Sequence, residues 1–167
     1  EMLRDADTAM HRAKTSGKGS HVVFDTEMYN RALRYIEWRD EMQRALDEHK
    51  FDLHFQPIIA TDSGKVSSLE ALVRWRSETY GPVSPAEFIP VAEESGLILP
   101  LGRWILRSVC EQIAHWKTLY GVELKVGVNL SGLQFNQANL AEEISELLAE
   151  AGVAPELLGV EITESVA

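Results

Sequence analysis

From Phe51 onward the sequence alternates between strand-like and helix-like segments that are joined by short loops. The first five residues of this region alternate apolar and polar side chains with a period of two, and residues 61–65 predict a hairpin-type turn into a second strand around Glu70. Apolar stripes at helical spacing follow at residues 101–120 and 140–151, and each precedes another strand-like run. Because strands that alternate with helices build parallel sheets, we expect an α/β fold with three or four parallel strands, too few to close a barrel.

Local signals also predict where two other helices lie. Ser84 is a capping residue that is followed by proline at the first helical position and by Glu87 at the third, which predicts a helix start. Pro90 is expected to kink or restart that helix. Residues 26–49 are highly charged but carry apolar residues at helical spacing, which predicts a long amphipathic connector helix.

Three strand-like runs contain an oxygen-bearing side chain where an apolar one would be expected, namely Glu70, Asn129 and Glu161. Isolated carboxylates are costly to bury unless they are paired or bound to a cation. Oxygen ligands without accompanying Cys or His select Mg²⁺, Mn²⁺ or Ca²⁺ over zinc. All three residues are expected near the carboxyl ends of their strands, where α/β folds place active sites. They therefore predict a shared site for a hard metal ion, and an enzyme is the first hypothesis.

Arg74 shares a strand face with Glu70 and Leu72, because residues two apart in a strand point the same way. Its planar fork of donors suits a phosphate group. The alternative is an ion pair between Glu70 and Arg74 on a half-exposed strand, as is common on protein surfaces.

The charge and the cysteine content limit the class of protein. A net charge of −10 disfavours binding to DNA or RNA by the surface as a whole. Cys110 is the one cysteine, so it cannot form an internal disulfide, which fits a reducing compartment, and its apolar helix face predicts a small buried side chain.

Five short motifs follow one another along the chain: FQPI at 55–58, EALVRW at 70–75, SPAEFIP at 84–90, NLS at 129–131 and EITES at 161–165. In this order they resemble the EAL family of cyclic di-GMP phosphodiesterases. The resemblance covers residues 51–167, which corresponds to the first half of a β/α barrel of typical size. It implies an α/β fold that is a partial TIM-like barrel of the EAL type.

The start of the chain is similar to the last helix and strand of a GGDEF diguanylate cyclase domain, through ADTAM at 6–10, GKG at 17–19 and VF at 23–24. The two resemblances together imply three parts of a tandem GGDEF–EAL signalling protein. We expect the end of the GGDEF domain at 1–25, a helical linker at 26–50 and the N-terminal half of the EAL domain at 51–167.

The EAL resemblance implies metal-dependent hydrolysis of cyclic di-GMP to linear pGpG, in a complete domain that holds two Mg²⁺ or Mn²⁺ ions. By position in the motifs, Glu70 would be catalytic and would ligate metal together with Asn129 and Glu161. The residues expected to seat the dinucleotide are Gln56, Leu72 and Arg74, and Glu164 would support the loop that links metal binding to dimerisation.

Other family residues that act at the metal site come after residue 167, so we expect this chain alone to be inactive. The resemblance also implies a homodimer through the complete EAL domain, an upstream sensory domain and a cytoplasmic setting. Any membrane anchor of the parent protein would lie upstream.

The alternative function is a non-catalytic cyclic di-GMP receptor. Receptor members of the family often lack the motif glutamate or a metal ligand, whereas Glu70, Asn129 and Glu161 are all present, which favours the enzyme. A third hypothesis, an unrelated α/β interaction domain, would require all five motif matches to be accidental.

Overall fold

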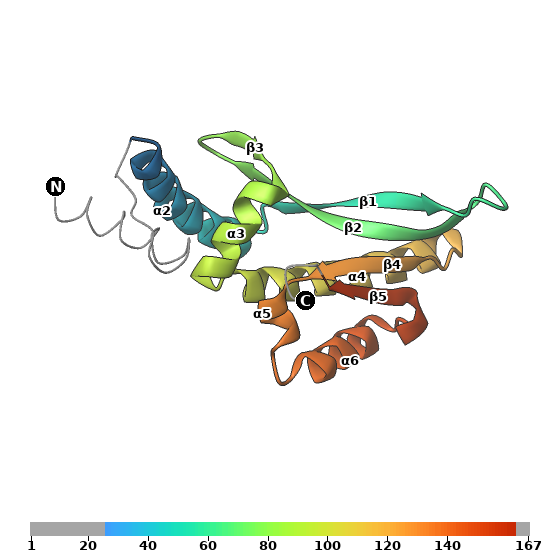
Figure 1. Ribbon diagram of the computed structural model, residues 1–167. Helices are drawn as coiled ribbons and strands as arrows, with labels where there is room; N and C mark the ends of the chain where they lie inside the picture. Colours follow the sequence, from blue (N-terminus) through green and yellow to red (C-terminus); the bar gives the residue numbers. More distant parts are fainter. Residues whose placement is uncertain (1–25, 163–167) are drawn as a thin grey trace, which may run out of the picture.

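A computed structural model describes the backbone of residues 26–162 and the side chains from Leu33 onward. The segment similar to a GGDEF domain, residues 1–25, and the predicted support residue Glu164 lie outside the described residues. The described elements, in chain order (Figure 1), are α2 (Thr26–Asp47), β1 (Phe51–Ile59), β2 (Val66–Ser77), β3 (Gly81–Val83), α3 (Pro85–Ser95), α4 (Ile98–Tyr120), β4 (Lys125–Leu130), α5 (Gly132–Phe135), α6 (Leu140–Ala151), the 3-10 helix η1 (Pro155–Leu157) and β5 (Leu158–Ile162).

The five strands form one mixed sheet in the order β1-β2-β4-β5, with β3 paired to β2. β2, β4 and β5 are parallel, as expected, whereas β1 and β3 run antiparallel to β2. The three parallel strands agree with the expected three or four, and β1 is antiparallel because the predicted hairpin turn is too short for a crossover connection. In that turn Ala60 N donates to Lys65 O at 2.9 Å, and Gly64 adopts a left-handed φ of 66°. The α/β class and the partial barrel are confirmed.

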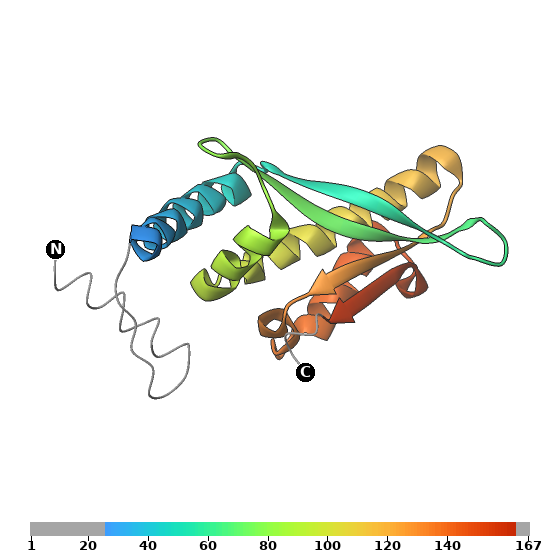
Figure 2. The ribbon, with the colours of Figure 1, turned by 45° about the horizontal axis from the view of Figure 1, so that its top comes forward.

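Helices cover one face of the parallel part of the sheet. Val126, Val128 and Leu130 of β4 are at most 1% exposed and belong to the same core as the buried side chains of α4 and α6. Both helices lie on the same side of β4 and β5 (Figure 2). Residues that alternate with these three along β4, such as Asn129, point to the opposite face, which no helix within residues 26–162 covers. We call this the open face, and a site that uses Asn129 lies on it.

The helix α3 begins where the sequence predicts, with Ser84 at the N-cap and proline at the first position, although the Ser84 side chain makes no capping hydrogen bond. It runs through Pro90 without restarting and ends instead at Gly96, whose φ of 78° is left-handed. Phe88 and Ala92 are fully buried on either side of Pro90, and their packing offsets the missing backbone donor. Between residues 26 and 162, none of the helices combines the length and apolar character that a membrane span requires.

Cys110 lies on α4 and is 1% exposed, as its apolar surroundings predict. Burial, and secondarily the neighbouring carboxylate of Glu111, raises the pKa of the Cys110 thiol. The side chain is therefore a protonated, small core residue.

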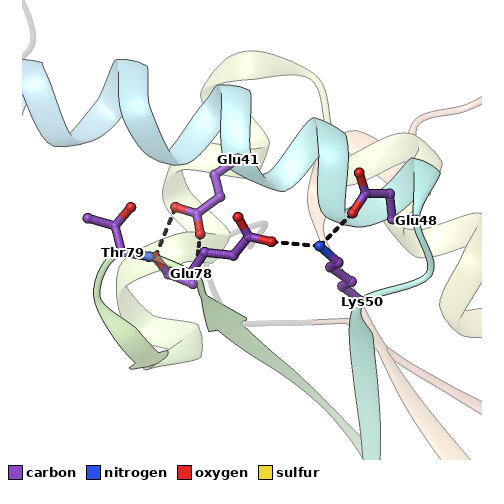
Figure 3. A network of polar contacts seen from close by, with 6 residues as sticks. Glu41, Glu48, Lys50, Glu78 and Thr79 are labelled. Carbon is purple, nitrogen blue, oxygen red and sulfur yellow. Dashed lines mark hydrogen bonds and ion pairs between the residues drawn. The ribbon is translucent and has the colours of Figure 1, made fainter.

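A helix is present where the sequence predicts one, as α2, and it packs against the end of β2. Trp38 meets Trp75 edge to face, with ring centroids 6.0 Å apart. Beside this contact Glu41 is only 6% exposed and accepts hydrogen bonds from the Ser77 hydroxyl, at 2.9 Å, and from the Glu78 backbone N–H (Figure 3). The sheet that carries the candidate site is thus attached to α2 by both apolar and polar contacts.

Glu41→Ala is expected to lower the free energy of unfolding by about 1–3 kcal/mol, because it leaves the buried Ser77 hydroxyl and the Glu78 N–H without their acceptor. Urea unfolding measures the loss. Glu48→Ala is the matched control, since it removes an exposed glutamate that pairs with Lys50 and should cost less than about 1 kcal/mol. Equal losses in the two variants would contradict a structural role for the Glu41 contacts.

Candidate functional site

The residues predicted as metal ligands lie on one face of the sheet. Glu70 of β2 is in register with Gly127 of β4, and Asn129 is in register with Glu161 of β5. Residues in register on neighbouring strands point to the same face, as do residues two apart on one strand. Glu70, Asn129 and Glu161 therefore share the open face, opposite the face that α4 covers.

Glu70 and Asn129 are in direct contact although 59 residues separate them in sequence. The Asn129 amide nitrogen Nδ2 donates to Glu70 Oε1 at 2.7 Å. This bond uses the amide nitrogen, so Oδ1 of Asn129 and Oε2 of Glu70 keep lone pairs for another ligand. Carboxylate and amide oxygens are the donors that Mg²⁺ and related cations take in proteins.

The Glu161 carboxylate lies over Gly127. A Cβ atom placed on Gly127 would be 3.0 Å from Glu161 Oε1 and 3.7 Å from its Cδ. Because Gly127 is also the register partner of Glu70, the bare backbone at this position leaves space beside both carboxylates. Gly127 was not among the residues predicted from the sequence. The signal that could have identified it is a glycine inside a strand-like run, which often marks a place where another group approaches the backbone closely.

A second glycine, Gly159, extends this open space. Gly159 is in register with Gly127, and the Lys125 side chain lies over it, with Cε 3.1 Å from the position of an added Cβ. A hollow of about 210 Å³ follows the same strands. It is lined by Ile58, Ser68, Leu69, Lys125, Gly127, Gly159, Val160 and Glu161.

The expected dinucleotide-binding residues lie on the same face as Glu70. Gln56 of β1 is in register with Glu70, and Leu72 and Arg74 follow Glu70 along β2 at two-residue intervals. Arg74 Nη1 donates to the backbone oxygen of Val73 at 2.9 Å, and the side chain is half-buried. No ion pair joins Glu70 to Arg74 among the described residues, so the alternative of a simple surface pair is not observed.

The expectation that all three candidate ligands lie near strand ends is correct for two of them. Asn129 and Glu161 are the penultimate residues of β4 and β5. Glu70 lies in the middle of β2, because β2 continues to Ser77 in its antiparallel pairing with β1 and β3. Its parallel pairing with β4 nevertheless stops at Ala71, so Glu70 lies at the end of the shared parallel region.

These three side chains fit a divalent cation by the chemistry of their donors. Within residues 26–162, no group of three or more His, Cys, Asp and Glu side chains comes together as a metal-binding cluster. The set of Glu70, Asn129 and Glu161 consists of two carboxylates and an amide, all of them oxygen donors on one face. Such a set favours Mg²⁺ or Mn²⁺ and disfavours zinc.

Comparison with known protein families gives a match over most of the chain. Residues 39–167 match the family model described as EAL domain. The cyclic di-GMP phosphodiesterase PdeR of Escherichia coli (strain K12) is 42% identical over 164 residues, which cover 98% of this chain and 24% of PdeR. The bifunctional diguanylate cyclase/cyclic di-GMP phosphodiesterase MucR of Pseudomonas aeruginosa is 33% identical over 167 residues, which cover 100% of this chain and 24% of MucR. The chain thus spans about a quarter of the length of these relatives.

Solved structures show the same fold. A PaMucR phosphodiesterase in complex with c-di-GMP superposes with a TM-score of 0.73 at 34% identity, over 78% of this chain and 53% of that one. The FimX EAL domain of Pseudomonas aeruginosa, bound to c-di-GMP, superposes with a TM-score of 0.69 at 29% identity, over 78% of this chain and 52% of that one.

Proposed function

Because the chain belongs to the EAL domain family, we propose that its parent protein hydrolyses one phosphodiester bond of cyclic di-GMP to give linear pGpG. Relatives such as PdeR carry the name of a cyclic di-GMP phosphodiesterase. The observation that supports the proposal is that strand register places Glu70, Asn129 and Glu161 on one face of the sheet, with Asn129 in hydrogen-bond contact with Glu70.

Glu70, Asn129 and Glu161 would hold Mg²⁺ or Mn²⁺ through their side-chain oxygens. When bound, a divalent cation supplies an activated water and neutralises charge at the phosphate. Asn129 orients the Glu70 carboxylate by donating to its Oε1. In the complete domain we expect a two-metal site, with the other ligands supplied by later residues.

Arg74, Gln56 and Leu72 would seat the dinucleotide. The Arg74 guanidinium has donors left after its bond to the Val73 carbonyl, and these would bind a phosphate oxygen pair. Gln56 lies across from Glu70 and can reach the same part of the face, while the backbone at Leu72 lies between Glu70 and Arg74. Glu164 would act indirectly, through the loop that couples the metal site to a homodimer.

The domain boundaries at 1–25, 26–50 and 51–167 remain part of this proposal, and so do a GGDEF domain and a sensory domain upstream. The name of MucR, a bifunctional diguanylate cyclase/cyclic di-GMP phosphodiesterase, supports a tandem arrangement. Because the dinucleotide is an intracellular bacterial messenger, hydrolysis would occur in the cytoplasm. The 167-residue chain by itself is expected to be inactive.

Removal of the metal tests the proposal. Treatment of the parent protein with EDTA should abolish the formation of pGpG, and addition of excess Mg²⁺ or Mn²⁺ should restore it, because the cation supplies the activated water. The product is followed by liquid chromatography. Binding of cyclic di-GMP without turnover at any metal concentration would instead identify a receptor.

Gly127→Ala should raise the Mn²⁺ concentration for half-maximal activity by about tenfold, because the added methyl group reaches the Glu161 carboxylate. Gly159→Ala is the matched control, since the closest atom to its methyl group is Cε of the flexible Lys125 side chain, at 3.1 Å, and its backbone neighbours, Gly127 Cα and Val126 O, lie at ordinary contact distances of 3.6 and 3.7 Å. An equal response of the two variants would contradict the placement of Glu161 at the metal.

A further inference from the structure

We propose that Gln134 and Gly102 are positioning residues that fix Asn129 in its hydrogen bond to Glu70. This inference rests on the proposed function for its consequence at the metal, but the positioning itself can be measured without metal. Asn129 lies two residues before Ser131, the N-cap of α5. The path of the chain at the end of β4 therefore decides where the Asn129 side chain lies.

A reciprocal pair of hydrogen bonds holds this part of the chain. The Ser131 backbone N–H donates to Gln134 Oε1 at 3.1 Å, and the Gln134 backbone N–H donates to Ser131 Oγ at 3.4 Å. Both residues are buried, with Ser131 6% and Gln134 4% exposed. Such a capping box fixes the direction in which the chain enters a helix.

Gly102 of α4 makes the room for the Gln134 side chain. A Cβ atom on Gly102 would be 1.6 Å from Gln134 Nε2 and 2.7 Å from its Cδ, so any larger residue there would displace the amide. Glycine is a poor helix former, yet it stands inside α4 at the point of contact. The long helix α4 thus supports Gln134, and Gln134 supports the turn that follows Asn129.

The burial pattern of α5 argues against a role in helix stability alone. The helix has four residues, and the apolar Leu133 and Phe135 are 51% and 50% exposed, while the polar Gln134 between them is buried. A capping box that served only α5 would support very little packed structure, whereas the same bonds determine the exit of β4.

The direct test is the side-chain amide signal of Asn129 in ¹⁵N-edited NMR spectra of the 167-residue chain without metal, assigned with Asn129→Asp. Gln134→Ala and Gly102→Ala should both shift this signal, because each removes the Gln134 contact to Ser131. Gln134→Glu should restore it, since a glutamate carboxylate accepts the same N–H. The double variant Gly102→Ala with Gln134→Ala should match Gln134→Ala and stay folded, because the methyl group occupies the vacated space.

The second readout is Mn²⁺ affinity of the parent protein, from the electron paramagnetic resonance signal of the free ion. Gln134→Ala should weaken binding about tenfold, as is usual for residues that orient metal ligands. Gln112→Ala, on α4, is the control and should leave affinity unchanged.

The outcomes separate the two proposals. An Asn129 signal that does not move in Gln134→Ala would overturn the positioning role, even where stability falls. If the Asn129 signal shifts in Gln134→Ala but the wild-type parent protein binds no Mn²⁺, the positioning role would be supported and the proposed function contradicted.

Discussion

Glu70→Ala in the parent protein is expected to lower kcat for cyclic di-GMP hydrolysis by roughly 10³-fold or more at saturating Mn²⁺. The substitution removes a proposed metal ligand, and it also removes the acceptor of the 2.7 Å bond from Asn129. Two of the three proposed ligands are thereby disturbed at once. Liquid chromatography of pGpG formed over time gives the rate.

Glu146→Ala is the matched control for Glu70→Ala, because Glu146 is an exposed glutamate of α6. It should retain the wild-type rate. If Glu70→Ala keeps more than about a tenth of the wild-type kcat, with an unchanged requirement for metal, Glu70 is not a metal ligand.

The largest expected loss of stability comes from Phe88→Ala, at about 3–5 kcal/mol in the free energy of unfolding. Phe88 is fully buried at the junction of α3 with the sheet. Its ring lies 5.7 Å from that of Trp75 and 6.2 Å from that of Phe51, measured between centroids. Truncation would open a cavity inside this aromatic cluster, and urea unfolding of the 167-residue chain measures the loss.

Phe135→Ala serves as the control for Phe88→Ala, because Phe135 is 50% exposed. Its loss should stay below about 1 kcal/mol. If the two substitutions cost the same, the aromatic cluster around Phe88 would not be the centre of the core.

Much of the fold follows from local patterns in the sequence. The hairpin at residues 61–65 was predictable because Gly64 supplies the left-handed conformation that the turn needs. The strand β3 was not, since the three residues Gly81–Val83 are too few to show a period and pair only through their contact with β2. Of the two outcomes expected at Pro90, a kink or a restart, the restart does not occur, because α3 is one helix whose residues Phe88 and Ala92 are fully buried on either side of the proline.

The candidate site was predictable in part. Glu70, Asn129 and Glu161 could be selected because each interrupts an apolar run, and the strand pairing brings them to one face. Gly127 and Gln134 were not selected. A glycine inside a strand-like run signals a close approach, but not which side chain approaches, and the contacts of Gly127 with Glu161 and of Gln134 with Gly102 form only when distant elements pack together.

The most direct test of the metal site is a crystal structure of the parent protein with Mn²⁺ and cyclic di-GMP, with the ion located by its anomalous scattering. We expect a peak on the open face of the sheet, at about 2.0–2.6 Å from side-chain oxygens of Glu70, Asn129 and Glu161. The dinucleotide should lie beside it, within reach of Arg74. An anomalous peak elsewhere, or bound dinucleotide with no ion at these three residues, would contradict the proposal that the parent protein is a metal-dependent phosphodiesterase with this site.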